Sequence, residues 1–379
     1  QRGAANLRIS EIKTALTIPP WDSPIHRLLG MNSIKIRILG VHFQSKFQLM
    51  QSLLPLVQGN LLNQAIYDEI ETYPENEILE AINVIQTANP IQSSRQLRLD
   101  EFEALQRAAS TGHPPVPSST PGGPPQFEII HQQVRTISGP GNHNIRITPV
   151  NRLRVVMVQT GYRRVPGGDP TLSSGVDCRY NDGNRYWYPG VELVGEGICI
   201  DLDPQTNPIA HFPLLGQAAN TWMDAWTNPG QFSQNLLTPE DRDQLHPVFV
   251  WWHTVSHRLI NALSIDSGYS SAAVRERVYV RIDENSGQAL GGVLLYTTQP
   301  GGDGTLGGMV ALAPAFDRVL NSALRTIDAC SNDPLCGEEQ FGAGKYNGAA
   351  CYACSLVSET SCEHRNMRLD RNLVLENLP

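Results

Sequence analysis

The chain has little positive charge, and this shortage limits the partners that it can bind on its own. Its 379 residues include 29 lysines and arginines against 37 aspartates and glutamates, which gives a formal net charge of −8. Nucleic-acid-binding domains usually carry a basic face or stripe. Any contact with DNA is therefore expected to be local, or shared with a more basic partner.

The sequence also shows no secretory signal and no apolar run long enough to span a membrane. These absences predict a cytoplasmic protein without a membrane partner. Disulfides are rare in the reducing cytoplasm. The seven cysteines are therefore better interpreted as metal ligands or buried thiols than as disulfides.

Several catalytic motifs are missing as well. The glycine-rich segment 301–308 lacks the lysine and the serine or threonine of a P-loop, so no ATPase activity is expected. His253 and His257 have the i, i+4 spacing of a helical metal site, but the glutamate of His-Glu-x-x-His is absent. A metal-dependent hydrolase that uses these two histidines is kept as an alternative function, and a packing role is the simpler interpretation.

Cysteines are concentrated at the end of the chain, where five of the seven lie within the last fifty residues. Cys330 and Cys336 form one short-spaced pair, and Cys351 and Cys354 form a second. Two such pairs can place four thiolates around one structural Zn²⁺ ion in a closed site that contributes folding energy. Cys362 could replace one of these ligands or simply be buried. Disulfides, free thiols and a redox Cys-x-x-Cys pair are the alternatives.

The pattern along the chain predicts a mixed α/β fold with a helical N-terminal part, a strand-rich middle and a C-terminal α/β zinc-binding domain. A segment with six prolines and three glycines in seventeen residues is expected to be a linker. The predicted regions are 1–109 (mainly helical), 110–126 (linker), 127–245 (strand-rich) and 246–379 (zinc-binding domain).

The last third of the chain contains short motifs in a distinctive order. They are His253-Thr-Val-Ser-His257, Ser267-Gly-Tyr-Ser270, Arg275-Glu-Arg-Val-Tyr279, Gly304-Thr-Leu-Gly-Gly308, the two cysteine pairs, Glu359-Thr-Ser-Cys-Glu363 and Asn366-x-x-Leu-Asp-Arg371. In order and spacing they resemble the MrfA-type zinc-binding domain, which occurs in certain superfamily 2 helicases and in stand-alone proteins of bacterial antiphage defence. Tyr352 stands where that family often has a histidine, so this position is not expected to supply a ligand.

A second set of motifs lies upstream of the cysteines. It comprises Asn151-Arg-Leu-Arg-Val-Val, Thr160-Gly-Tyr-Arg-Arg164, Tyr188-Pro-Gly-Val-Glu192 and Gly195-Glu-Gly-Ile-Cys199. These motifs resemble the DrmB family of bacterial DISARM antiphage systems. The resemblance implies a non-catalytic accessory subunit in the bacterial cytoplasm, which binds a DrmA-like helicase and reaches DNA through or with that partner. The alternative within this group is the C-terminal zinc-binding part of an MrfA-like DNA-repair helicase.

Seven arginines are candidate contacts for DNA phosphates. They are Arg365, Arg368 and Arg371 after the cysteines, and Arg152, Arg154, Arg163 and Arg164 in the strand-rich region. The first three are spaced at i, i+3 and i+6, which predicts one side of a helix. Phosphate contacts would make binding sensitive to salt and independent of sequence. Ion pairs within the chain are the competing interpretation.

Aromatic residues in the strand-rich region could stack on unpaired bases. They include Tyr162, Tyr186, Trp187 and Tyr188. Their position among expected strands favours a place in the hydrophobic core.

Overall fold

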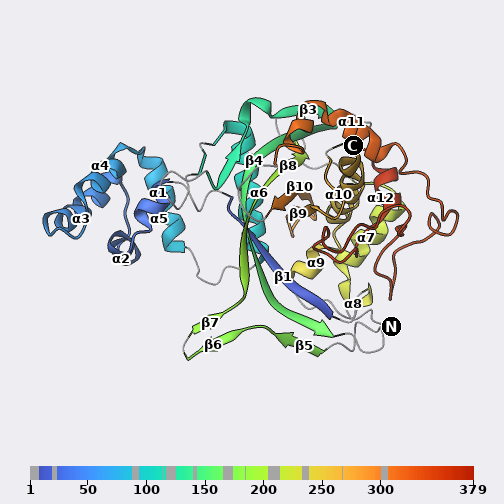
Figure 1. Cartoon of the computed structure of the whole chain (residues 1–379), viewed down its shortest axis with the longest axis horizontal. Coiled ribbons are helices and arrows are strands. Elements are labelled where there is room, and N and C mark those ends of the chain that lie inside the picture. The colour runs from blue at the N-terminus through green and yellow to red at the C-terminus, as the bar shows by residue number, and fades with distance from the viewer. Residues whose placement is uncertain are drawn as a thin grey trace. The chain divides into compact units, whose positions relative to one another are not determined.

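The computed structural model describes residues 8–18, 24–87, 94–113, 115–116, 125–139, 143–164, 174–183, 185–203, 214–232, 239–266, 268–299 and 306–379. The chain forms two compact units, and Figure 1 shows their elements. The larger unit comprises Gln1–Thr17, Arg107–His113 and Gln126–Pro379, and the smaller comprises Ile18–Gln106 and Pro114–Pro125. Most of the expected proline-rich linker lies outside the described residues.

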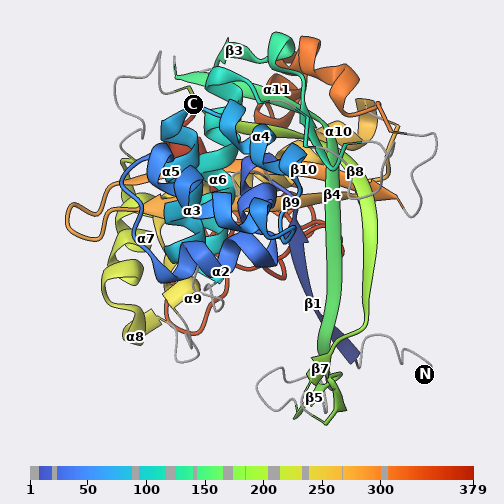
Figure 2. The ribbon, with the colours of Figure 1, turned by 90° about the vertical axis from the view of Figure 1, so that its left-hand side faces the viewer.

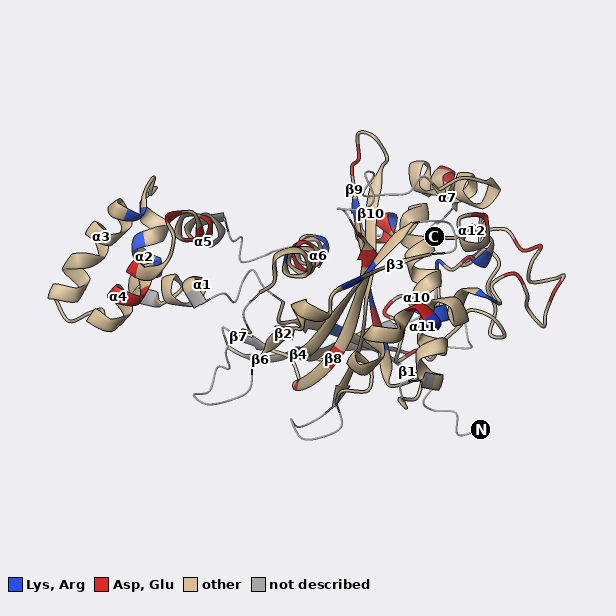
Figure 3. Cartoon of the chain, turned by 90° about the horizontal axis from the view of Figure 1, so that it is seen from above, with Lys and Arg blue, Asp and Glu red and all other residues tan. Residues whose placement is uncertain are grey.

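The smaller unit is built from short amphipathic helices. They are α1 (Pro24–Leu29), α2 (Asn32–Gly40), α3 (Lys46–Gln58), α4 (Gln64–Thr72), α5 (Glu75–Thr87) and most of α6 (Ser94–Thr111). The Ser45 side chain accepts a hydrogen bond from the Gln48 amide and thereby caps α3. Leu49, Leu53 and Ile78 belong to its buried core. Acidic residues gather on α4 and α5 (Figure 3), so these helices offer no basic surface.

A curled antiparallel sheet organises the larger unit. Its strands are β1 (Arg8–Leu16), β2 (Phe127–Ile129), β3 (Arg135–Ser138), β4 (Asn144–Arg164), β5 (Ser174–Asp177), β8 (Gly190–Leu202), β9 (Val274–Ile282) and β10 (Ala289–Gln299). The order is β1-β4-β8-β10-β9, and β2, β3 and β5 each pair with β4. The guanidinium of Arg277 on β9 donates to the Thr14 carbonyl of β1 at 3.1 Å, so the curl brings the two ends of this order together.

The outer ends of β1, β4 and β8 extend away from the rest of the sheet (Figure 1). Near their tip lie β5 and the two-stranded ribbon of β6 (Tyr180–Asp182) and β7 (Arg185–Trp187). We call residues 155–164, 174–183 and 185–194 the strand arm. Its exposed aromatic side chains include Tyr180, Trp187 and Tyr188, at 67%, 56% and 41% of full exposure. The expectation that the last two belong to the core is wrong.

The helices of the larger unit pack against the sheet around α10 (Pro247–Asp266), which shares a core with β9 and β10. Figure 2 shows the long neighbouring strands β4 and β8 of this sheet. The other helices are α7 (Gln217–Thr227), α8 (Pro229–Phe232), α9 (Pro239–Asp243), α11 (Phe316–Leu324) and α12 (Arg371–Glu376), with the 3-10 helices η1 (His131–Gln133) and η3 (Val310–Ala315). Trp251, Val255 and Leu259 of α10 share one core with Val278 of β9 and Val293 of β10. The mixed α/β class predicted from the sequence is confirmed.

No helix among the described residues is both long and apolar enough to cross a bilayer.

Candidate metal centre

The two cysteine pairs lie in the long connection from α11 to α12. Residues 325–370 are all described and contain neither an α-helix nor a β-strand. Cys330 and Cys336 lie in its first turns, and Cys351 and Cys354 follow in a later turn. A segment of this kind has few ladder hydrogen bonds of its own. Its order must come from other interactions.

The four sulfur atoms converge on one point. Cys330 Sγ lies 3.4 Å from Cys351 Sγ, and Cys354 Sγ lies 3.8 Å from both Cys336 Sγ and Cys351 Sγ. A tetrahedral zinc site with bonds of about 2.3 Å places its sulfurs about 3.8 Å apart. All four cysteines are free thiols, so disulfides do not explain the cluster. The cluster therefore suits one zinc ion.

Hydrogen-bond donors surround these sulfurs. The Asn332 amide N–H points at Cys330 Sγ, and its side-chain amide points at Cys351 Sγ, both at 3.4 Å. Burial by itself raises the pKa of Cys351, but the Ala353 amide and the neighbouring thiols outweigh it and lower the pKa to about 7, whereas burial raises the pKa values of Cys330 and Cys336. Donors that favour thiolate are typical of the outer shell of a metal site.

We call residues 325–370 the cysteine loop. Side chains from several elements attach this loop to the helical core. Arg258 of α10 donates to the Cys354 carbonyl at 2.8 Å and to the Ala323 carbonyl at 3.0 Å. The buried Asp370 carboxylate accepts from Trp222 Nε1 of α7 at 2.9 Å and from the Ala349 amide at 3.2 Å. These contacts attach the middle of the loop to α10 and its C-terminal end to α7.

The three arginines after the cysteines do not form a helical face, and this expectation is wrong. Residues 365–370 are irregular, Arg365 and Arg368 have positive φ angles of 57° and 68°, and α12 begins only at Arg371. Arg371 is buried, pairs with Asp333 and donates to the Ile327 carbonyl at 3.2 Å. Arg368 is also buried, so only Arg365 of this group is exposed.

The second group of arginines lies on β4. Arg152 is half-buried, and Arg154 forms an ion pair of 2.7 Å with Glu192 of β8. Arg163 and Arg164 stand in the part of β4 that pairs with β1 and β5, and their side chains lie outside the described atoms. Contact of these residues with DNA stays a prediction.

His253 and His257 lie on one face of α10, fully buried beside Glu276 of β9 and Cys362. Cys362 therefore belongs to a second cluster and does not replace one of the four cysteines around the first centre. Glu276 was not predicted as a site residue. The available signal was its place between Val274 and Val278, in the row of β9 that faces the core, where a carboxylate is unusual.

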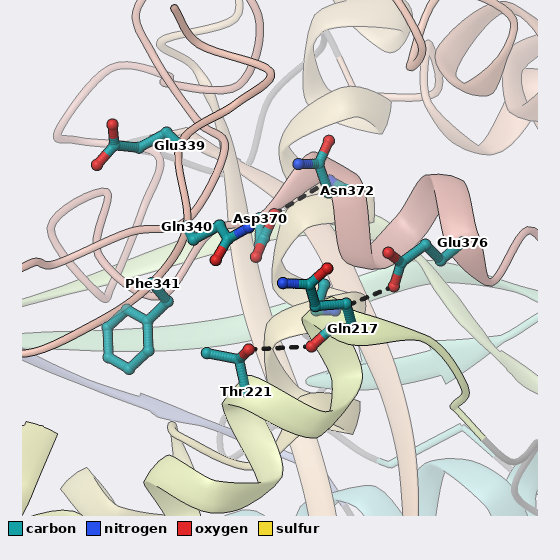
Figure 4. A pocket seen from close by; sticks show the side chains of 9 residues that line it. Gln217, Thr221, Glu339, Gln340, Phe341, Asp370, Asn372 and Glu376 are labelled. Atoms are coloured by element: carbon teal, nitrogen blue, oxygen red, sulfur yellow. Dashed lines mark hydrogen bonds between the residues drawn. The ribbon is translucent and has the colours of Figure 1, made fainter.

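A small pocket of about 80 Å³ lies between α7, the segment around Phe341 and α12 (Figure 4). Gln217 and Thr221 of α7 line it on one side, and Asp370 and Glu376 lie at the opposite side. Pockets for small-molecule ligands usually enclose about 300–1,000 Å³. This one is too small for such a ligand.

The cysteine centre defines the class of this region. Residues 255–355 match the family model described as the MrfA Zn-binding domain, and this range contains all four clustered cysteines. The C-terminal part of the chain therefore carries an MrfA-type zinc-binding domain.

One similar protein matches a longer part of the chain than the zinc-binding domain. The chain is 34% identical over 244 residues to the DISARM protein DrmB of Bacillus paralicheniformis, and the match covers 62% of this chain. The chain spans 41% of the length of that relative. The resemblance to DrmB and to the MrfA zinc-binding domain is confirmed.

Among solved structures, the DUF1998 helicase MrfA bound to DNA is similar with a TM-score of 0.28 and 12% identity. The similarity covers 58% of this chain and 22% of the helicase chain. A score this low does not indicate a shared overall fold.

Proposed function

We propose that this chain is a non-catalytic, zinc-containing accessory subunit of a DISARM-type antiphage system. It associates with a DrmA-like helicase and supports the helicase's engagement of DNA. The similarity to DrmB carries this proposal. The partner supplies ATP hydrolysis, and this chain supplies a platform held together by its metal centre.

The chemistry of the centre supports a structural role. Four sulfur ligands leave no position for a water molecule or a substrate on the zinc ion. Zinc bound there would join the turns of a loop that has no regular secondary structure of its own. The pocket between α7 and α12 is too small for a typical small-molecule ligand. These features favour a binding subunit over a hydrolase.

The strand arm is the surface best suited to DNA. Trp187 and Tyr188 are exposed at its tip, where an unpaired base could stack on either ring. Arg154 lies closer to its base and is partly exposed. Stacking and a few phosphate contacts would permit local binding despite the net charge of −8.

Co-expression with the helicase of the same defence locus tests the partnership. We expect the chain to co-purify with the helicase, and the complex to bind single-stranded DNA more tightly than the helicase alone. Trp187→Ala together with Tyr188→Ala should weaken DNA binding by the complex roughly tenfold or more, which corresponds to one lost stacking contact. Fluorescence anisotropy at several salt concentrations measures this change.

Arg318→Glu on α11 is a matched surface control, because it changes exposed charge away from the strand arm. It should leave DNA affinity close to that of the wild type. A chain that never co-purifies with the helicase would refute the partnership. If a stable complex forms and its affinity for DNA is unchanged by the aromatic substitutions, the partnership stands. The DNA would then bind outside the strand arm.

A further inference from the structure

A second group of metal-ligating side chains lies in the core, apart from the four clustered cysteines. His253 and His257 of α10, Glu276 of β9 and Cys362 of the cysteine loop form this group, which we call the α10 cluster. Their ligand atoms all lie within 4.8 Å of one another. The two histidines and Glu276 are 0% exposed, and Cys362 is 6% exposed.

The Nδ1 atoms of the two histidines already have hydrogen-bond partners outside the cluster. His253 Nδ1 lies 3.2 Å from the Arg368 carbonyl, and His257 Nδ1 lies 2.7 Å from the Ser355 carbonyl. A carbonyl oxygen only accepts hydrogen bonds, so both Nδ1 atoms carry hydrogen. The Nε2 atoms of the neutral rings then present lone pairs to the interior of the cluster. Metal-bound histidines usually have this outer contact with a carbonyl or carboxylate.

The Nε2 atoms of the two histidines point into the cluster, toward a carboxylate oxygen and a sulfur. Glu276 Oε1 lies 2.9 Å from His253 Nε2 and 3.3 Å from His257 Nε2. Cys362 Sγ lies 3.3 Å from His253 Nε2. In neutral rings, two lone pairs would therefore converge with a carboxylate and a sulfur. This arrangement of electron-rich atoms is favourable when a cation lies between them.

The carboxylate and the sulfur are also held from outside. Ser256 donates its hydroxyl hydrogen to Glu276 Oε2, which leaves Oε1 to face the histidines. The amides of His364 and Asn366 donate to Cys362 Sγ at 3.3 and 3.2 Å. Burial and the nearby Glu276 carboxylate raise the pKa of the Cys362 thiol against these two hydrogen bonds, so a bound metal ion would have to displace its proton. Each member of the α10 cluster thus has an outer partner that orients it inward.

We infer that the α10 cluster binds one Zn²⁺ ion in a closed, structural site. Two neutral imidazoles, one carboxylate and one thiolate balance the charge of a divalent ion, so that no net charge is buried. Tetrahedral coordination by nitrogen, oxygen and sulfur is a usual zinc arrangement. Two of the four ligands, His253 and Cys362, lie outside the range matched by the family model.

The site does not have the features of a hydrolase. All four ligands come from the chain and are buried, so the ion has no open position for water. The Ser355 residue links the two metal centres: its hydroxyl lies 3.3 Å from Cys354 Sγ, and its carbonyl accepts from His257. The second ion therefore ties the cysteine loop to α10 and β9. This inference does not depend on the proposed partner.

Metal analysis of the whole purified chain tests the site. The wild type should contain two zinc ions per chain by mass spectrometry. Zinc X-ray absorption should show a mixed shell, with nitrogen or oxygen near 2.0–2.1 Å and sulfur near 2.3 Å. Glu276→Gln and Cys362→Ala should each retain one ion in a shell of sulfur alone.

Cys199→Ala is the matched control for Cys362→Ala, because Cys199 is a buried free thiol outside both clusters. It should retain both ions. If the variants of the α10 cluster do not fold, the wild-type measurements still decide the question. One zinc per chain with a sulfur-only shell would overturn the inference, as would two ions retained in Cys362→Ala.

Discussion

The two cysteine-containing clusters of this protein are built in opposite ways. The four-cysteine centre draws its ligands from 25 consecutive residues, Cys330 to Cys354, in a loop without regular secondary structure. The α10 cluster draws its ligands from a helix, a strand and a loop between residues 253 and 362. The first organises a segment that lacks a ladder of its own, whereas the second lies inside a packed core.

This difference indicates that metal has a different task at each place. At the four-cysteine centre, zinc would replace missing backbone structure. At the α10 cluster, Val274 and Val278 on either side of Glu276 already belong to the hydrophobic core. A metal there adds a crosslink to an existing scaffold. The comparison therefore predicts that the loop is far more sensitive to loss of its ion than the sheet is.

Cys351→Ser should give the largest effect. Structural zinc binding is worth about 10–16 kcal/mol, comparable with the whole stability of a domain. We expect loss of this zinc ion, and fast amide exchange across residues 330–354 in hydrogen-exchange mass spectrometry. Amides of β8 and β10 should stay protected, because the core holds these strands. Slow exchange in the loop after zinc loss would show that the loop folds without metal.

Arg371→Leu should give an intermediate effect on the loop side of the comparison. The substitution leaves Asp333 without its guanidinium partner and removes the hydrogen bond to the Ile327 carbonyl. We expect a loss of about 3 kcal/mol in unfolding free energy, at the low end for a broken buried pair because Asp333 is partly exposed. Urea denaturation measures it.

Arg365→Leu is the control for this substitution, since Arg365 is exposed in the same segment. It should change the unfolding free energy by less than about 0.5 kcal/mol. Equal effects of the two substitutions would contradict a specific structural role for Arg371.

His246→Gln should give the smallest effect. It tests the packed core around α10 and not the cysteine loop. Burial lowers the pKa of His246 from 6.5 to about 4, against the opposing hydrogen bond with the Gly287 carbonyl. Its Nδ1 accepts from the Val248 amide, so the neutral ring is satisfied at both nitrogens. The unfolded chain takes up this proton near pH 6.5, and the folded chain does so only near pH 4.

Stability from His246 is therefore complete above pH 6.5 and is lost as the pH falls toward 4. At pH 5 the loss relative to pH 7 should be about 2 kcal/mol. Denaturation of wild type and His246→Gln at both pH values isolates this contribution from protonation of the metal ligands, because those ligands are common to both proteins. Identical pH dependence of the two proteins would contradict the assignment.

The sequence predicted the features that are local along the chain. Paired cysteines predict a zinc site because both members of a pair lie in one turn. The i, i+4 spacing of His253 and His257 likewise predicted that they share a helical face. Glu276 and the true place of Cys362 were not predicted, because strand packing and the return of the loop bring them together across long separations.

Two further errors have physical reasons. The arginine spacing suggested a helix, but residues 365, 366 and 368 adopt left-handed backbone conformations that interrupt one. Trp187 and Tyr188 were expected in the core because aromatic residues favour strands. The strand arm extends beyond the helices that cover the sheet, so these rings have no layer to pack against.

One backbone hydrogen bond of the cysteine loop has a consequence for solubility. The Glu276 amide on β9 donates to the Ser361 carbonyl at 3.0 Å, and β9 is the last strand in the order of the sheet. The loop therefore occupies part of an edge that would otherwise offer unpaired amides to another chain. When zinc is scarce, a loosened loop would uncover this edge in an otherwise folded molecule. Zinc would then protect the protein against edge-to-edge aggregation as well as against unfolding.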